Sequence, residues 1–189
     1  GVDIEGAKKN LLAEATHTNF AEYVSAAKDQ WDTELAKIKV YDKREESKHV
    51  FYTDLYHCMI SPNIFNDVDG RYRGRDDKIH STEGKFNYYT VFSLWDTYRG
   101  LHPLLALIDK KRTADFIQTF IQQYQQGGRL PIWELSSNET NCMIGYHAVS
   151  VMLDAYVKGV RGFDVQQAYT AMKAASETSL FGIQKFHEK

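Results

Sequence analysis

Apolar residues recur at three- and four-residue intervals along most of the 189-residue chain. This spacing puts them on one face of an α-helix and differs from the alternation of a half-buried strand. It predicts helices over residues 5–15, 19–38, 49–60, 91–100, 103–108, 112–126, 141–158 and 164–176. No strand series and no repeat is visible, so the predicted fold class is all-α. Helical hairpins with long functional loops at one end suit part of an (α/α)6 toroid.

Length and charge exclude several classes of protein. The chain is long enough for one hydrophobic core, so residues 1–189 are predicted to form a single domain. A net charge of −2 gives no basic surface for nucleic acid or for an anionic membrane. No stretch reaches the roughly 20 apolar residues of a membrane span. The two cysteines, Cys58 and Cys142, lie in apolar surroundings and are predicted to be buried free thiols.

Two irregular stretches, residues 63–89 and 129–140, interrupt the helices. Long loops in compact domains are often functional, so candidate site residues are expected there and beside them. The acidic run around Asp67 and Gly70 suggests a calcium loop or a solvated turn. An EF-hand is excluded, because placing Gly70 at loop position six puts Phe65 at the first ligand position.

The segment around Trp95 offers a sugar-binding chemistry. Asp96 and Arg99 are three residues apart and would share a helix face. A carboxylate and a guanidinium can hold vicinal hydroxyls, and an adjacent Trp can stack on a sugar ring. The alternative interpretation is a salt bridge within the helix.

Two glutamates are candidate acids. Glu134 follows Trp133, and Glu139 is predicted to open the apolar helix 141–158. A glutamate at the start of a helix can instead serve as part of its cap, so both interpretations stay open.

Five segments in this order resemble glycoside hydrolase family 92. They are residues 51–57 (FYTDLYH), 67–74 (DVDGRYRG), 92–99 (FSLWDTYR), 127–135 (GGRLPIWEL) and 138–147 (NETNCMIGYH). The resemblance implies a calcium-dependent exo-α-mannosidase that inverts the anomeric configuration. It also implies an (α/α)6 catalytic domain packed on an N-terminal β-sandwich, and a bacterial periplasmic or secreted location.

The resemblance also implies roles for individual residues. Glu139 would be the general acid and is preferred to Glu134, because the run from Glu139 to Gly145 is the more characteristic of the two. Mannose-binding roles fall on two groups of residues. The terminal-mannose group comprises Trp95, Asp96 and Arg99, with Asp67 and His147 nearby, and the next-sugar group comprises His187 and Glu188, which would favour an α-1,2 link.

The chain is expected to hold only the N-terminal part of that catalytic domain. An inverting enzyme needs two carboxyl groups roughly 6.5–9.5 Å apart. The family's general base lies downstream of anything in this sequence, and the β-sandwich and part of the calcium site are expected to be absent. The isolated chain is therefore predicted to be inactive and to expose an apolar seam that drives oligomerisation. The alternative is a non-catalytic helical carbohydrate-binding or scaffold module.

Overall fold

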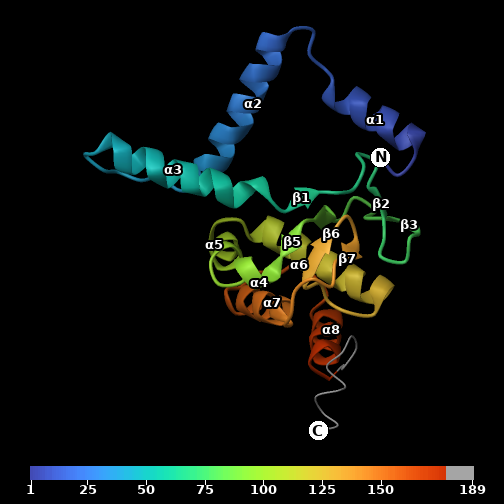
Figure 1. Cartoon of the computed structure of the whole chain (residues 1–189). Coiled ribbons are helices and arrows are strands. Elements are labelled where there is room, and N and C mark those ends of the chain that lie inside the picture. Colours follow the sequence, from blue (N-terminus) through green and yellow to red (C-terminus); the bar gives the residue numbers. More distant parts are fainter. Residues whose placement is uncertain (178–189) are drawn as a thin grey trace. The chain divides into compact units, whose positions relative to one another are not determined.

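The computed structural model of the chain describes residues 1–177 (Figure 1). The elements group into two compact units. Unit 1 comprises Gly1–Arg73 and Ile79–Val91, and unit 2 comprises Gly74–Lys78 and the chain from Phe92 onward. Helices dominate both units and strands are short, which confirms the predicted helical fold class.

Unit 1 contains three helices and two small antiparallel strand pairs. The helices are α1 (Ile4–Glu14), α2 (Phe20–Leu35) and α3 (Glu45–Ile60). Strand β1 (Asn63–Ile64) pairs with β4 (Tyr89–Thr90), and β2 (Arg71–Arg73) pairs with β3 (Ile79–Ser81). The hairpin β2–β3 lies inside the irregular stretch 63–89, for which the sequence suggests a long loop with a short hairpin.

Helix starts in unit 1 follow from capping side chains. The Asp3 carboxylate accepts a hydrogen bond from the Gly6 amide (2.6 Å), and the Asn19 side chain accepts one from the Glu22 amide (3.1 Å). Such bonds satisfy amide donors that have no partner within the helix. Helix α3 ends at Ile60, the predicted end, two residues before Pro62.

The core of unit 1 contains a stacked pair of tyrosine rings. Tyr72 on β2 and Tyr88 just before β4 are fully buried, with ring centroids 3.8 Å apart and an interplanar angle of 16°. Burial of two aromatic side chains stabilises a segment that has little regular structure of its own. In contrast, α2 has no buried residue in the structure of residues 1–177.

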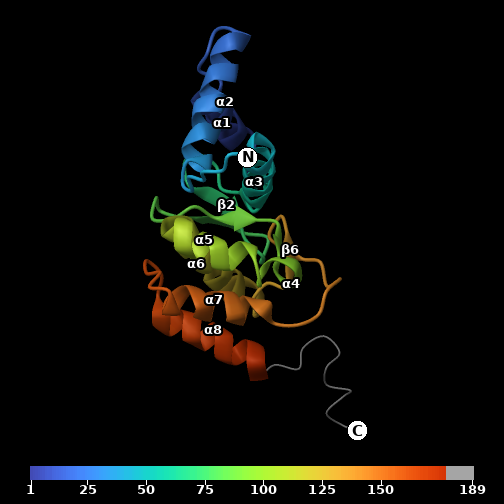
Figure 2. The ribbon, with the colours of Figure 1, turned by 90° about the vertical axis from the view of Figure 1, so that its left-hand side faces the viewer.

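Up to Glu177, unit 2 contains five helices and a three-stranded antiparallel sheet. The helices are α4 (Leu94–Thr97), α5 (Leu101–Ile108), α6 (Lys110–Gly127), α7 (His147–Val157) and α8 (Val165–Glu177). The sheet has the order β5 (Phe92–Ser93), β6 (Trp133–Leu135), β7 (Asn138–Glu139). Helix α5 packs against α6 and α7, and α8 packs against the same two helices (Figure 2).

Aromatic rings join the sheet to helices α5 and α6. Phe92 on β5 lies edge-on to Phe116 (5.4 Å between centroids) and to Phe120 (4.8 Å) on α6. His102 on α5 lies edge-on to Phe116 at 5.8 Å. Since all four rings are buried, this cluster fixes β5 on the helical core.

Two predicted helices are wrong in extent. Residues 91–100 form strand β5 and the single turn α4, and the apolar helix predicted from residue 141 begins only at His147. Asn141 and Gly145 have φ of 55° and 94°, which a right-handed helix cannot contain. Consequently Glu139 lies in a strand and does not open a helix.

The burial predicted for the thiols is also wrong for Cys142. This residue belongs to the non-helical segment before α7 and is exposed, whereas Cys58 on α3 is half-buried. Burial raises the pKa of the Cys58 thiol.

Local residues set two helix boundaries in unit 2. Gly128 ends α6 with φ of 79°, and the Asp164 carboxylate accepts a hydrogen bond from the Gln167 amide at the start of α8 (2.9 Å). Over residues 1–177, no helix has the length and apolar character needed to cross a membrane.

The buried His102 makes stability depend on pH. Burial lowers its pKa from 6.5 to about 4, and its Nδ1 has no hydrogen-bond partner within the described residues. The unfolded chain therefore takes up a proton first as the pH falls. We expect the free energy of unfolding to be highest above pH 6.5 and to fall by up to about 3 kcal/mol as the pH is lowered to about 4, measured by denaturant titration.

The control is His102→Phe, which keeps an aromatic ring in the Phe92, Phe116 and Phe120 cluster and removes the titrating group. In this variant, the part of the pH dependence of the free energy of unfolding that comes from His102 should be absent. An unchanged slope between pH 6.5 and 4 in the variant would show that His102 is not responsible.

Candidate functional site

The sheet β5–β6–β7 joins the segment containing Trp95 to the segment containing both candidate acids. Phe92, Glu134 and Glu139 occupy one row across the three strands. At the neighbouring position, the amide of Leu94 donates to the carbonyl of Ile132 (3.2 Å). Helix α4 therefore starts directly beside the beginning of β6.

A tight turn with unusual backbone angles connects β6 to β7. Ser136 and Ser137 have φ of 51° and 64°. Two consecutive positive φ values match the twist of a two-residue hairpin but are strained for residues other than Gly or Asn. The Glu134 carboxylate accepts a hydrogen bond from the Ser137 amide (2.5 Å), which holds the turn from inside.

Glu134 is fully enclosed, with 0% of its surface exposed. A carboxyl group in this position cannot meet a bound sugar in this conformation. The contact with Ser137 gives Glu134 a structural role in the hairpin.

Glu139 is half-buried, and backbone amides hold its carboxylate. Its Oε2 accepts from the Ile132 amide (2.7 Å) and its Oε1 from the Trp133 amide (3.1 Å). These bonds bring the carboxylate to the start of β6, next to the hydrogen bond between Ile132 and Leu94. Its Oε1 also accepts a longer hydrogen bond from the Asn141 amide (3.4 Å). Since a carboxylate offers about four acceptor positions, these three bonds do not exhaust it.

Trp95 and Asp96 lie on α4 and are open to solvent. The Trp95 side chain is 48% exposed, which leaves aromatic surface for a ligand. The Ser93 hydroxyl donates a hydrogen bond to Asp96 and thereby orients its carboxylate. Among the residues described, no ion pair joins Asp96 to Arg99, because α4 ends at Thr97 and Arg99 turns toward Tyr98.

Arg99 and His147 meet at the ring of Tyr98. The Arg99 Nε donates to the Tyr98 hydroxyl, and its Cζ lies 5.0 Å from the ring centroid. The His147 ring lies edge-on to Tyr98, with centroids 4.4 Å apart and an interplanar angle of 89°. Burial, and then the positive charge of Arg99, lower the pKa of His147.

Asp67 belongs to unit 1, where it anchors α1. The buried carboxylate accepts hydrogen bonds from the Val2 amide (2.9 Å) and from the Asn10 side-chain amide (2.8 Å). Asn10 also accepts a hydrogen bond from the Val68 amide (2.9 Å). Gly6 passes so close that a Cβ there would lie 2.3 Å from Asp67 Oδ2. The observed contacts are structural, and the predicted contact of Asp67 with mannose stays a prediction.

Two of the predicted substrate-binding residues, His187 and Glu188, lie outside the described residues. Within residues 1–177, no group of three or more His, Cys, Asp or Glu side chains is arranged to hold a metal ion.

Sequence analysis missed two residues of this region, Tyr98 and Gly145. Tyr98 contacts both Arg99 and His147, while Gly145 leaves the space that the His147 ring occupies. Both lie within the quoted motifs, beside a charged or titratable residue. The sequence offered two signals for these residues. Gly145 lies two residues before His147, and Tyr98 lies next to Arg99.

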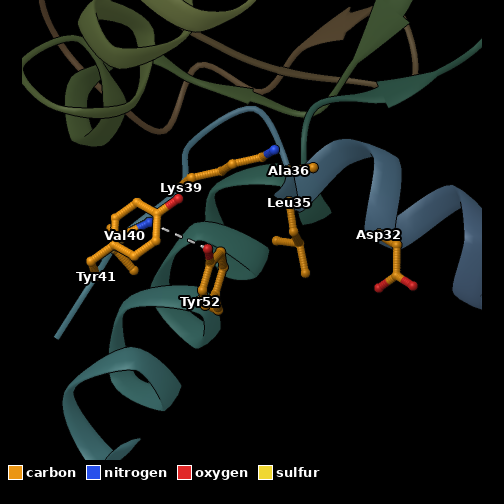
Figure 3. Close-up of a pocket in the computed structure, with 7 residues that line it drawn as sticks. All are labelled: Asp32, Leu35, Ala36, Lys39, Val40, Tyr41 and Tyr52. Atoms are coloured by element: carbon orange, nitrogen blue, oxygen red, sulfur yellow. Dashed lines mark hydrogen bonds between the residues drawn. The ribbon is translucent and has the colours of Figure 1, made fainter. Parts of the chain in front are cut away.

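A separate hollow of about 520 Å³ lies in unit 1 between the end of α2 and α3 (Figure 3). Its lining residues are Asp32, Leu35, Ala36, Lys39, Val40, Tyr41 and Tyr52. The Tyr52 hydroxyl donates to the Ile38 carbonyl (3.3 Å) and accepts from the Val40 amide (3.5 Å), so its ring is fixed. None of the predicted site residues lines this hollow.

Comparison with known proteins places the chain in a family. The glycosyl hydrolase family 92 catalytic domain matches residues 6–188. The chain belongs to glycosyl hydrolase family 92. This result confirms the resemblance seen in the five motifs. No match was found among curated proteins.

Solved structures of family 92 share the fold. The family GH92 α-mannosidase BT3965 from Bacteroides thetaiotaomicron is 41% identical with a TM-score of 0.89, over 98% of this chain and 25% of its own. The same protein in complex with mannoimidazole gives 42% identity and the same TM-score, over 98% of this chain and 24% of its own. The inverting mannosidase BT2199 from the same organism gives 28% identity and a TM-score of 0.83, and the match covers 90% of this chain and 23% of BT2199. The chain thus spans about a quarter of the length of these family 92 structures.

The closeness of Gly6 to Asp67 can be tested by adding a methyl group. Gly6→Ala should displace the Asp67 carboxylate and weaken its bond to Val2. Overpacking costs about 1–3 kcal/mol, and the higher helix propensity of Ala offsets up to about 1 kcal/mol. We expect a net loss of about 1–2 kcal/mol in the free energy of unfolding, measured by denaturant titration.

Two controls separate the clash from other effects. Gly100→Ala meets no atom within 4 Å and should change stability little. In an Asp67→Ala background the obstacle is gone, so Gly6→Ala should be neutral or stabilising. The same loss in both backgrounds would contradict the explanation.

Proposed function

We propose that this chain forms part of an enzyme that hydrolyses terminal α-linked mannose with inversion. The observation that carries the proposal is 41% identity across 98% of the chain to a structure described as a family GH92 α-mannosidase. A second family 92 structure is described as an inverting mannosidase. The proposed partner is a mannose-containing glycan, and binding of mannoimidazole by a relative supports it.

Glu139 is the proposed general acid. It protonates the departing glycosidic oxygen while a water molecule attacks the anomeric carbon from the opposite face. Partial exposure and a fixed carboxylate support Glu139, whereas Glu134 is enclosed. The base that accepts the proton from water is proposed to lie on residues other than these 189.

The mannose subsite is proposed to contain Trp95, Asp96, Arg99 and His147. All four belong to unit 2, and their side chains supply a stacking surface, a carboxylate, a guanidinium and an imidazole. Vicinal hydroxyls both donate and accept hydrogen bonds, so this set is chemically suited to them. Asp67, His187 and Glu188 stay in the proposal through the resemblance alone, as does a preference for α-1,2 links.

Calcium is proposed as a cofactor of the longer family 92 polypeptide, with an incomplete binding site on this chain, on the resemblance alone. No step above depends on the metal. A periplasmic or secreted location is also proposed on the resemblance alone.

Glu139→Gln tests the proposed general acid. The variant is made in a longer polypeptide that contains this chain and is as long as the family 92 relatives. Mannose release from a natural mannoside should fall by roughly 10²–10⁴-fold, since the amide cannot donate the proton. Binding of mannoimidazole should persist. A mannoside with a phenolate leaving group of low pKa needs less protonation and should lose much less activity.

Equal losses for both kinds of mannoside would contradict the acid role. Glu134→Gln is the matched control: it should lower thermal stability without this dependence on the leaving group. If the parent polypeptide releases no mannose, the alternative of a non-catalytic carbohydrate-binding or scaffold module takes precedence. The 189-residue chain on its own should release none.

Self-association is the remaining part of this proposal. Several apolar side chains of unit 1 are largely exposed, including Ile4 (75%), Leu12 (76%) and Phe20 (83%). Contiguous apolar surface favours association. We expect the 189-residue chain to sediment as oligomers and the variant Leu12→Ser/Phe20→Ser to shift toward monomer; a monomeric parent chain would contradict this.

A further inference from the structure

Tyr98 lies between two residues of the proposed mannose subsite that come from different elements. It is the C-cap residue of α4, next to Arg99, while His147 is the first residue of α7. The Tyr98 hydroxyl accepts the hydrogen bond from Arg99, and the edge of one ring meets the face of the other where Tyr98 contacts His147. One side chain therefore fixes both neighbours.

Gly145 restrains the same imidazole from another direction. A Cβ at Gly145 would lie 2.3 Å from Cε1 and 2.5 Å from Nδ1 of His147. Its φ of 94° is unfavourable for any residue with a side chain. The His147 ring is thus packed against the backbone of Gly145 as well as against Tyr98.

Electrostatics give the pair Arg99 and His147 complementary functions. Arg99 offers only donors, whereas a neutral imidazole offers one donor and one acceptor. Burial and the nearby Arg99 charge lower the pKa of His147, which keeps it neutral at neutral pH. The two side chains can therefore hold two adjacent hydroxyls. The guanidinium donates a hydrogen bond to one hydroxyl, and the imidazole accepts a hydrogen bond from the other.

We propose that Tyr98 and Gly145 form a cradle that positions Arg99 and His147 for adjacent hydroxyls of the terminal sugar. Tyr98 acts as a positioning residue and needs no contact with the sugar itself. This inference rests on the proposed mannoside function and adds the residues that organise its subsite.

The first test follows the His147 titration by NMR in the 189-residue chain. Tyr98→Leu removes the ring and the hydroxyl, so the His147 pKa should rise toward 6.5 as burial and the fixed Arg99 charge are lost. Tyr98→Phe keeps the ring and should give a smaller rise. Tyr169→Leu on α8, an exposed tyrosine outside this cluster, is the matched control and should leave the His147 titration unchanged.

The second test measures mannoimidazole affinity and steady-state kinetics in the longer family 92 polypeptide. Misplaced binding groups cost on the order of tenfold to a hundredfold, so Tyr98→Leu and Gly145→Ala should weaken affinity and raise KM by about this factor. Tyr98→Phe should lose about two- to fivefold, as expected for one hydrogen bond. The ratio of activities on mannosides with good and poor leaving groups, which reports on Glu139, should stay as in the parent.

The outcomes separate this inference from the proposed function. An unchanged His147 titration in Tyr98→Leu overturns the cradle whatever the enzyme does. A shifted titration with unchanged mannoimidazole affinity overturns its role in sugar binding. If the parent polypeptide neither binds mannoimidazole nor releases mannose, the proposed function fails, while the titration still decides whether the cradle exists.

Discussion

The hydrogen bonds that two carboxylates make with backbone amides hold the candidate site together. The strands β5, β6 and β7 have only two or three residues each, so their own ladder bonds are few. Glu134 secures the turn between β6 and β7 from inside, and Glu139 spans from β7 to the first residues of β6. These bonds add to the few ladder bonds of so small a sheet. Without them the motif after α6 would have little to fix it beside α4.

The same sheet depends on the aromatic core beneath it. Phe92 begins β5 and is buried among rings from α5 and α6. Burial of large aromatic side chains provides the main favourable free energy at this point, whereas the polar bonds of the sheet provide direction. Trp95, two residues after Ser93, consequently projects from a rigid base although α4 is only one turn long.

The motif residues fall into two groups by burial and contacts. Asp67 anchors α1 through Val2 and Asn10, and Glu134 braces a strained turn. Trp95, Asp96 and Arg99 are exposed and have few structural contacts. The motif residues thus form two groups. In one group, buried carboxylates make several hydrogen bonds within the protein; in the other, exposed side chains make few.

The sequence by itself determined most of the long helices and the family. Helical periodicity is strong over ten or more residues, so α1, α2 and α6 could be predicted, and five ordered motifs are specific where each alone is weak. Strands of two or three residues carry no periodicity, and positive φ at Asn141 delays α7, so the environment of Glu139 could not be predicted. Only the tertiary structure brought Tyr98 to His147 and Glu139 to the start of β6. The first contact joins residues far apart in sequence, and the second depends on the positive φ values of the turn between β6 and β7. Local spacing encodes neither.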